Sequence, residues 1–402
     1  MTKKNCSVFF ILTILILFSF NIYAKDQGWH LSYYNDDLPQ LSEEDLEKYK
    51  GATEWWYFDI QKEDFSLVVI YVRQNPLVYK DASSYIHIEY EKNGEVVKKV
   101  RETREMIIKT YEPVSTDNKL VQDRALTRFY MDEKNEFSML AKSSDPELID
   151  EYQLSFDVAG ISGKLNFKPI HQGFYVNDDG CYFHHKENPE LKSCANFAAP
   201  RMKGWGWVVY KKEAEGSGCN PAYTYEHTDI YESEPGEGYH DHPWNTDHFI
   251  ATYHEWHWGR LFAEDVSVMY ANVIPQDEYN GILNFAYYTK KGEYKPYVDL
   301  DIEIIPEEKP WEKETDSFLN VAFPHNLKLI SKDLGFEIRT QFQSLLADDP
   351  MYNRSNVKFI FWETNDDFNA EGTGWTEYVT IPTENQWLIS NLNWLKYLGR
   401  RF

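Results

Sequence analysis

Histidine and acidic residues gather near the middle of the chain, among many aromatic residues. Six of the 12 histidines fall in the range His227–His257, and two of them flank an acid in the run Tyr239-His240-Asp241-His242. Residues two apart on a β-strand point to the same side, so Tyr239 and Asp241 should share one face and the two histidines the other. A carboxyl group among aromatic rings loses solvation, which raises its pKa and lets it donate a proton. The run therefore predicts either acid catalysis by Asp241 or a buried structural network.

The same histidines also suit a metal site, because His240 and His242 could act as paired ligands on one strand face. The segment from His254 to His257 is one residue shorter than the zinc motif His-Glu-x-x-His, and on a strand its two histidines would face opposite sides. We therefore expect hydrogen-bonded histidines and no metal or cofactor. The sequence also lacks a G-x-S-x-G nucleophile motif, a P-loop and a dinucleotide-binding glycine motif.

A second acid, Glu54, opens an aromatic run, and this run is repeated later in the chain. Residues 54–67 align without a gap to residues 255–268, with five identities that include Glu54 with Glu255 and Trp55 with Trp256. The Gly-x-Gly-Tyr-x-Asp segment that ends at Asp241 likewise matches the Gly-x-Gly-Trp-x-Glu segment of residues 372–377. We interpret both pairs as one internal repeat. Each half should begin with a Glu-Trp strand and end with a Gly-x-Gly strand.

Turn signals separate short β-rich segments in both halves. Asn93-Gly94 predicts a type I′ hairpin, and Lys291-Gly292 predicts a second hairpin whose outer strand should run over residues 294–304. Helices are expected at Ser42–Lys50, which opens with a capping box, and near the C-terminus at Gln386–Leu398. These signals are typical of a mostly antiparallel β-protein.

The repeat and the turn signals together predict an all-β fold of two consecutive antiparallel β-barrels with short flanking helices. We place the first barrel domain at residues 40–245 and the second, with its C-terminal helix, at residues 246–402. Each half is long enough for a closed barrel of about eight strands, a size that can enclose one small ligand.

The charge of the chain limits its partners. With 41 Lys and Arg against 65 Asp and Glu, the formal net charge is −24, so nucleic acid and anionic membrane surfaces should be repelled. The aromatic content of 16% supplies too much apolar surface for a disordered acidic chain. We therefore expect a folded protein that does not bind nucleic acid.

The first residues resemble an export signal. Lys3 and Lys4 precede the uncharged stretch Val8–Phe20, which is too short to cross a bilayer comfortably, and Ala24 follows before the next charge. We expect residues 1–24 to be a signal peptide, with an uncleaved anchor as the alternative. The mature protein would then be secreted or periplasmic, without stable membrane insertion. Of the cysteines left in that oxidising compartment, Cys181 and Cys194 are the pair favoured for a disulfide.

The motifs taken together resemble one known family. Glu54-Trp55-Trp56-Tyr57-Phe58 resembles the EWWY signature of the AttH and hydroxyneurosporene synthase (carotenoid 1,2-hydratase) family. The segments 236–245, 256–260 and 372–378 are similar to that family's G-x-G-Y-x-D-H-x-W-G, W-x-W-G-R and closing-strand motifs, except that Asn245 stands where the family has Gly. The resemblance implies two consecutive lipocalin-like β-barrels. It also implies relatives that hydrate an isoprenoid double bond or cyclise a substrate.

Three functions remain open at this stage. The first is a carrier of a small hydrophobic, isoprenoid- or lipid-like molecule, and the second is a lyase, a hydratase or cyclase that needs no cofactor. The third is a structural module whose barrels are filled by their own side chains. For the lyase, Asp241 would be the acid and a histidine the water activator. The candidate catalytic residues are Asp241, His242, His240, Tyr239 and Glu54, and the candidate ligand-binding residues are Trp55, Trp56, Tyr57, Trp244, Trp256, His257 and Trp258.

Overall fold

The computed structural model describes most of the chain between Trp29 and Ile381. The described residues are 29–32, 37–75, 84–93, 95–103, 105–111, 126–142, 145–177, 179–213, 223–281, 283–293, 297–307, 326–349, 352–364 and 368–381. The expected signal peptide and the expected helix at Gln386–Leu398 lie outside them. Within the described part, no helix is long and apolar enough to cross a membrane.

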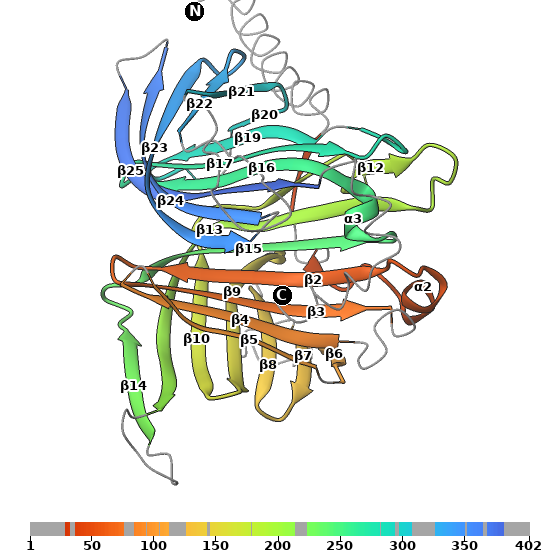
Figure 1. Cartoon of the computed structure of the whole chain (residues 1–402), viewed down its shortest axis with the longest axis vertical. Coiled ribbons are helices and arrows are strands. Elements are labelled where there is room, and N and C mark those ends of the chain that lie inside the picture. Colours follow the sequence, from red (N-terminus) through yellow and green to blue (C-terminus); the bar gives the residue numbers. More distant parts are fainter. Residues whose placement is uncertain are drawn as a thin grey trace, which may run out of the picture.

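The first sheet, sheet A, holds sixteen of the described strands and curls into a half-barrel (Figure 1). Its main path runs β5-β4-β3-β2-β15-β13-β10-β9-β8-β7-β6. The strands of sheet A are β1 (Trp29–Leu31), β2 (Thr53–Gln61), β3 (Phe65–Gln74), β4 (Ser84–Lys92), β5 (Glu95–Thr103), β6 (Ile107–Tyr111), β7 (Leu126–Asp132), β8 (Asn135–Lys142), β9 (Asp145–Val158), β10 (Ile161–Pro169), β11 (Phe174–Val176), β12 (Cys181–His185), β13 (Lys192–Glu213), β14 (Tyr223–Ile230), β15 (Gly236–Asn245) and β18 (Tyr279–Asn280).

The second sheet, sheet B, holds nine described strands in the order β20-β19-β17-β16-β25-β24-β23-β22-β21 and forms a nearly closed barrel. Its strands are β16 (Tyr253–Phe262), β17 (Val266–Pro275), β19 (Leu283–Lys290), β20 (Tyr297–Asp299), β21 (Ile302–Pro306), β22 (Leu327–Ser331), β23 (Phe336–Asp349), β24 (Tyr352–Glu363) and β25 (Asn369–Thr380). The described helices are short: α2 (Glu43–Lys48) and α3 (Phe249–Thr252). The all-β prediction of two lipocalin-like barrels is confirmed.

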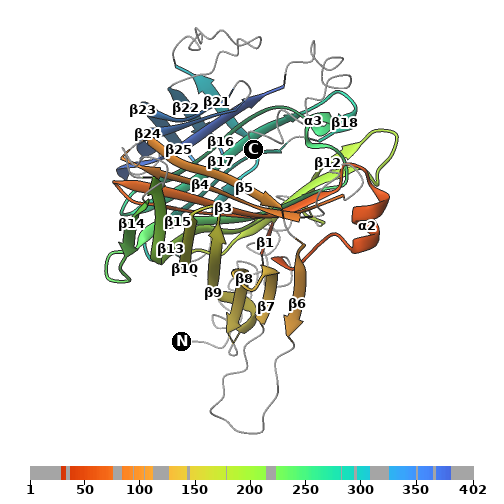
Figure 2. The same ribbon diagram turned by 60° about the horizontal axis from the view of Figure 1, so that its bottom comes forward.

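Alternation along the strands gives each sheet its own core and leaves a third core between them. On β2, Trp56, Phe58 and Ile60 point into the first barrel, whereas Tyr57 packs outward on the core between the sheets. On β16, Leu261 belongs to the core of the second barrel. Figures 1 and 2 show the two sheets stacked, with β2 and β15 lying against sheet B.

The internal repeat is confirmed by strand register. In the first half Gly238 pairs with Ile60 and Asp241 with Tyr57, and in the second half the equivalent Gly374 pairs with Leu261 and Glu377 with Trp258. The glycines are required by close approach: a Cβ at Gly374 would lie 2.1 Å from the carbonyl oxygen of Arg260. Each half therefore uses the same pair of strands to face the other half.

Two local predictions differ in outcome. The helix after Ser42 begins with the predicted capping box, in which Asp45 closes the box, and it ends at Lys48. The predicted strand over residues 294–304 is wrong, because its described part forms two short strands that pair with different neighbours. The backbone N–H of Asp301 donates to the side chain of Asp299, a local turn that ends β20 before β21 begins.

Candidate functional site

Four strands line the junction between the sheets, and every second residue of each strand points into it. β2 and β15 form one side, and β16 and β25 form the other. Equivalent registers in the two halves stack these residues in layers. One layer contains Asp59, Tyr239, Arg260 and Trp375, and the next contains Tyr57, Asp241, Trp258 and Glu377. The junction is thus a pseudo-symmetric site built by both copies of the repeat.

Asp241 is a half-buried acid enclosed by aromatic rings. Its Oδ2 accepts a hydrogen bond of 2.7 Å from the hydroxyl of Tyr239, and its buried Oδ1 has no hydrogen-bond partner among the described residues. Tyr239 packs edge-to-face on Tyr57 and on Trp258. Burial raises the pKa of Asp241 to about 7, because it outweighs the lowering by the Tyr239 hydrogen bond. Asp241 can therefore carry a proton on Oδ1 near neutral pH.

The neighbouring layer holds a buried ion pair between the two halves of the repeat. Asp59 and Arg260 occupy equivalent positions, and their side chains form an ion pair while fully buried. The guanidinium of Arg260 lies 4.4 Å from the ring centroid of Trp375 and 5.3 Å from that of Tyr239. Burial raises the pKa of Asp59 to about 7 although Arg260 opposes the shift.

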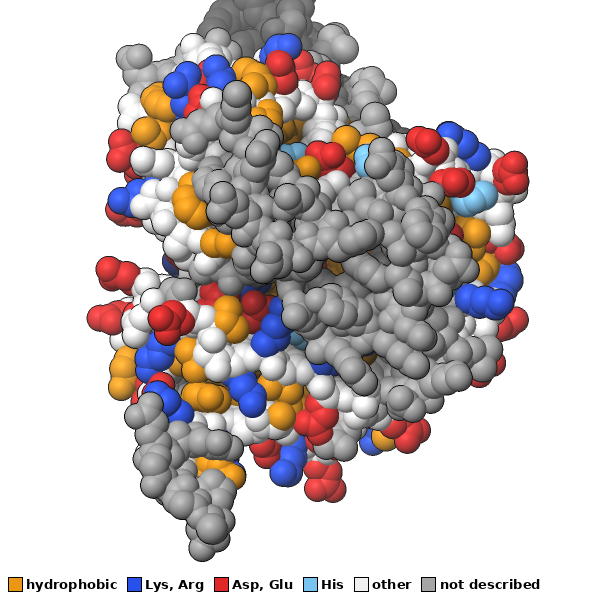
Figure 3. All heavy atoms as spheres, viewed as in Figure 1, with side chains coloured by type: hydrophobic (Ala, Val, Ile, Leu, Met, Phe, Trp, Pro, Cys, Tyr) orange, Lys and Arg blue, Asp and Glu red, His pale blue; other side chains and the backbone are white. Residues whose placement is uncertain are grey.

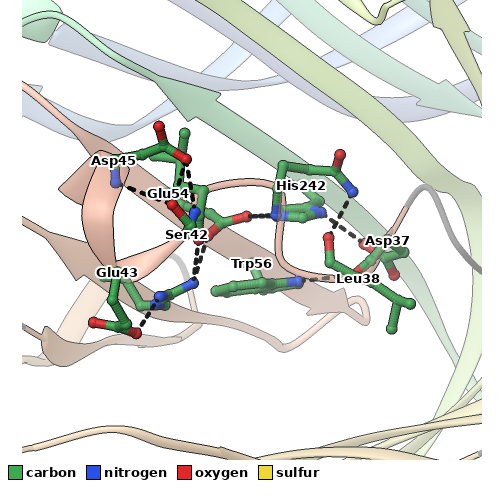
Figure 4. Close-up of polar contacts among 11 residues, drawn as sticks. Asp37, Leu38, Ser42, Glu43, Asp45, Glu54, Trp56 and His242 are labelled. Atoms are coloured by element: carbon green, nitrogen blue, oxygen red, sulfur yellow. Dashed lines mark hydrogen bonds and ion pairs between the residues drawn. The ribbon is translucent and has the colours of Figure 1, made fainter. Parts of the chain in front are cut away.

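On the other face of β15, the two histidines belong to a closed network inside the first barrel. Nε2 of His242 lies 2.8 Å from Oε1 of Glu54, and its Nδ1 lies 3.3 Å from Oδ1 of Asp37. His240 bonds Oδ2 of Asp37 through Nε2 and the carbonyl of Tyr57 through Nδ1, both at 2.8 Å. Figure 4 shows His242 held between the carboxylates of Glu54 and Asp37. These four side chains are fully buried.

This network shifts the pKa values of His242 and Asp37 in opposite directions. Burial alone would lower the pKa of His242, but the carboxylates of Asp37 and Glu54 outweigh burial and raise the pKa to about 9. Burial would raise the pKa of Asp37, yet His240 and His242 lower it to about 2. Arg73 donates to Oε2 of Glu54 at 2.9 Å. Glu54 therefore lies between two positively charged partners, Arg73 and His242. A buried network that is this fully paired is costly to break.

The candidate residues therefore divide between two faces. His240, His242 and Glu54 point into the first barrel and hold β2 and β15 in place, so they do not reach a molecule beside Asp241. A histidine of this run as water activator does not fit that geometry. Successive side chains of a strand point to opposite faces, so His240 and His242 point away from the face that carries Asp241.

The aromatic candidates divide in the same way. Half-buried rings from both copies of the repeat line the junction, whereas Trp56 is fully buried in the first barrel and stacks on His242. Trp244 packs on the disulfide between Cys181 and Cys194, which is present as predicted. His257 bonds Glu255 on the opposite face of β16. The candidate rings at the junction are Trp55, Tyr57, Trp256 and Trp258.

A cleft of about 1170 Å³ opens at the end of the junction where β2 and β16 turn back. Phe262, Arg201 and Glu237 line it, and Arg201 makes two hydrogen bonds to Glu237 and one to Ser267. Figure 3 shows basic and acidic side chains interspersed over the described part of one face, and a hollow in its outline where the sheets meet. Among the described residues, no group of three or more His, Cys, Asp or Glu side chains is arranged so that it could hold a metal ion.

Four polar residues of these sites were not among the sequence candidates. Asp59 and Arg260 occupy equivalent repeat positions, and this opposite charge at one position was the available signal. Asp37 and Arg73 carry no comparable signal, because each reaches Glu54 or the histidines from a distant part of the chain.

Neither a family model nor a curated protein sequence matches this chain. Among solved structures, CghA with Sch210972 aligns with a TM-score of 0.58 and 12% identity over 88% of this chain and 99% of CghA. NE1406 from Nitrosomonas europaea, assigned as an AttH, aligns with a TM-score of 0.51 and 12% identity over 87% of this chain and 97% of its own. The chain has an AttH-like fold.

Kievitone hydratase from Nectria haematococca aligns with a TM-score of 0.49 and 13% identity over 88% of this chain and 97% of its own. At these identities the likeness concerns the fold of the AttH-like proteins. The alignments with CghA and NE1406 agree with the two lipocalin-like barrels of the described residues, and the chemistry of this chain depends on the residues of the junction.

Proposed function

We propose that this AttH-like protein binds a small hydrophobic molecule between its barrels and that Asp241 protonates it. The observation that supports this most directly is the position of Asp241, whose Oδ1 is buried beside aromatic rings and has no hydrogen-bond partner among the described residues. Burial there raises the pKa of Asp241 to about 7. A carboxyl group with such a pKa is well suited to general acid catalysis at neutral pH.

The junction offers apolar contact from both barrels. Trp55 and Tyr57 come from β2, and Trp256 and Trp258 come from β16, all partly accessible to solvent. Sites for small ligands combine such apolar walls with a few fixed polar groups. Support for a small-molecule ligand also comes from CghA, whose structure with the same fold contains Sch210972.

The proposed reaction class is that of a lyase, a hydratase or a cyclase. Oδ1 of Asp241 transfers its proton to one carbon of a double bond, and the faces of Tyr57 and Trp258 stabilise the resulting cation. Water then forms a bond to the cationic carbon and returns a proton to Asp241, which completes hydration. In a cyclase, a second double bond of the substrate attacks instead, and loss of a proton to Asp241 ends the reaction. Tyr239 holds Oδ2 throughout.

We also propose export to the periplasm or the medium. The signal-like start of the sequence supports this, and the Cys181–Cys194 disulfide suits an oxidising compartment. N-terminal sequencing of the exported protein should begin at Lys25. A cytoplasmic product that keeps Met1 would contradict export.

Extraction of the natively purified protein with organic solvent, followed by mass spectrometry, tests the binding site. We expect a hydrophobic molecule at close to one per chain. Trp258→Ala should lower its yield at least tenfold, because this ring packs on Tyr239, whose hydroxyl donates to Asp241. Trp207→Ala is the matched control, since Trp207 is exposed on β13, and its yield should equal that of the wild type. An empty wild-type protein, or equal loss in both variants, would contradict the proposed site.

A further inference from the structure

Arg260 is a buried cation whose hydrogen-bonding capacity is only partly used within the described structure. Its side chain is fully buried, and its ionic partner there is Asp59. Its Nη2 contacts Oδ1 of Asp59, whereas Nε and Nη1 have no hydrogen-bond partner among the described residues. Nε1 of Trp375, next to this pair, is also buried and has no hydrogen-bond partner among the described residues.

An arrangement of this kind is incomplete as a purely structural pair. A guanidinium carries five N–H donors, and buried donors without acceptors cost free energy. The Asp37 network shows how this chain pairs buried charges elsewhere, because each ring nitrogen of His240 and His242 lies within 3.3 Å of a carboxylate or carbonyl oxygen. The N–H groups of Arg260 that have no partner among the described residues can therefore donate to one more acceptor. An anion is the acceptor that forms the strongest hydrogen bonds with a guanidinium.

We propose that Arg260 binds the acidic group of the substrate, so that the substrate is an amphipathic organic acid, carrying a carboxylate or an acidic enol on an apolar body. This inference rests on the proposed function and specifies its substrate class. In the unliganded protein, the carboxylate of Asp59 forms an ion pair with Arg260 in place of the ligand's acidic group. Because the pKa of Asp59 is about 7, Asp59 can take up a proton when the ligand replaces it.

The register of the strands sets the geometry of such a ligand. Arg260 lies two residues from Trp258 on β16, and Tyr239 lies two residues from Asp241 on β15. Two residues of a strand span about 7 Å. The acidic group bound by Arg260 should therefore lie roughly 7 Å along the junction from the carbon that Asp241 protonates, a separation that defines the size of the substrate's reactive part.

The cleft at the end of the junction supplies an approach for an anion. The ring of Phe262 lines the cleft and also lies 5.3 Å from the guanidinium carbon of Arg260. Five Lys or Arg and five Asp or Glu side chains line the cleft, whereas the chain as a whole has a net charge of −24. An anion that enters this cleft therefore meets balanced charge, although the protein as a whole is acidic.

The test compares two fluorescent probes that differ only in charge, cis-parinaric acid and its methyl ester, at pH 7.5. We expect the wild type to bind the acid at least tenfold more tightly than the ester. Asp59→Asn removes the competing carboxylate and should tighten binding of the acid alone. Arg260→Met should make the two affinities equal, and circular dichroism checks its folding. Lys358→Met, which removes an exposed cation of the cleft, should leave the ratio unchanged.

Each outcome bears on a different claim. Equal affinities for acid and ester in the wild type, or no effect of Asp59→Asn, would overturn the role of Arg260 and leave the proposed function standing. A ratio that falls as much in Lys358→Met as in Arg260→Met would show general attraction and would also overturn it. Binding of neither probe would count against the hydrophobic site itself.

Discussion

Replacement of Asp241 by asparagine should make the protein more stable at high pH. The substitution keeps the size of the side chain and an oxygen that can accept from Tyr239. It removes the group whose ionisation burial opposes. The pKa of Asp241 is about 7 in the folded protein against an ordinary value of 3.8 for aspartate, so the folded state binds the proton more tightly than the unfolded state does. Such a group makes stability fall as pH rises between these two values.

The size of the effect follows from linkage. A difference of about 3 pKa units corresponds to about 4 kcal/mol, which is an upper limit because the side chain is partly accessible. Of this, about 2 to 3 kcal/mol should appear between pH 5 and pH 8. The free energy of unfolding of Asp241→Asn minus that of the wild type should therefore increase by up to about 2 to 3 kcal/mol over this interval.

Urea denaturation of both proteins at several pH values, followed by tryptophan fluorescence, measures this difference. Asp64→Asn is the matched control, since Asp64 is exposed in the turn after β2, and its difference from the wild type should be flat with pH. A flat difference for Asp241→Asn as well would refute the raised pKa. A variant less stable than the wild type at pH 8 would show that the carboxylate is needed to hold the junction.

Two further changes test the scaffold around the site. His242→Gln should lower the free energy of unfolding by about 3 to 5 kcal/mol at pH 6, because it leaves buried carboxylates unpaired. The loss should be smaller at pH 10, since the stabilisation from a histidine with a raised pKa disappears as pH rises through about 9; an equal loss at both pH values would contradict the charged histidine. Reduction of the Cys181–Cys194 disulfide, whose cysteines are 13 residues apart, should cost about 3 kcal/mol, as measured by denaturation with and without reductant. Cys219→Ser should not reduce this cost, and a protein equally stable when reduced would refute it.

Much of the fold could be predicted because the two copies of the repeat share their strand pairing as well as their sequence. Aligning Glu54 with Glu255 also aligns the strand pairs that face the junction. Alternation predicted that Asp241 and the histidines lie on opposite faces of β15. Applied to β2, the same rule separates Trp56 from Trp55 and Tyr57, although all three were candidates for one site.

The rest depends on contacts between distant segments. Asp37 has no motif around it, and its role follows only from the position that it takes between His240 and His242 in the folded chain. Arg260 was part of a recognised motif, but its pairing with Asp59 requires the two halves to pack face to face. Local patterns set strands and faces, whereas the charges that meet across a junction depend on how complete sheets pack.

The central claim is that Asp241 performs acid chemistry on a molecule bound between the barrels. The most direct measurement compares the molecules extracted from wild type and from Asp241→Asn, purified from the same source. We predict that the variant retains an unconverted substrate and the wild type a product, differing by one water for a hydratase or in retention time alone for a cyclase. The same molecule in both proteins would contradict acid catalysis and leave a carrier.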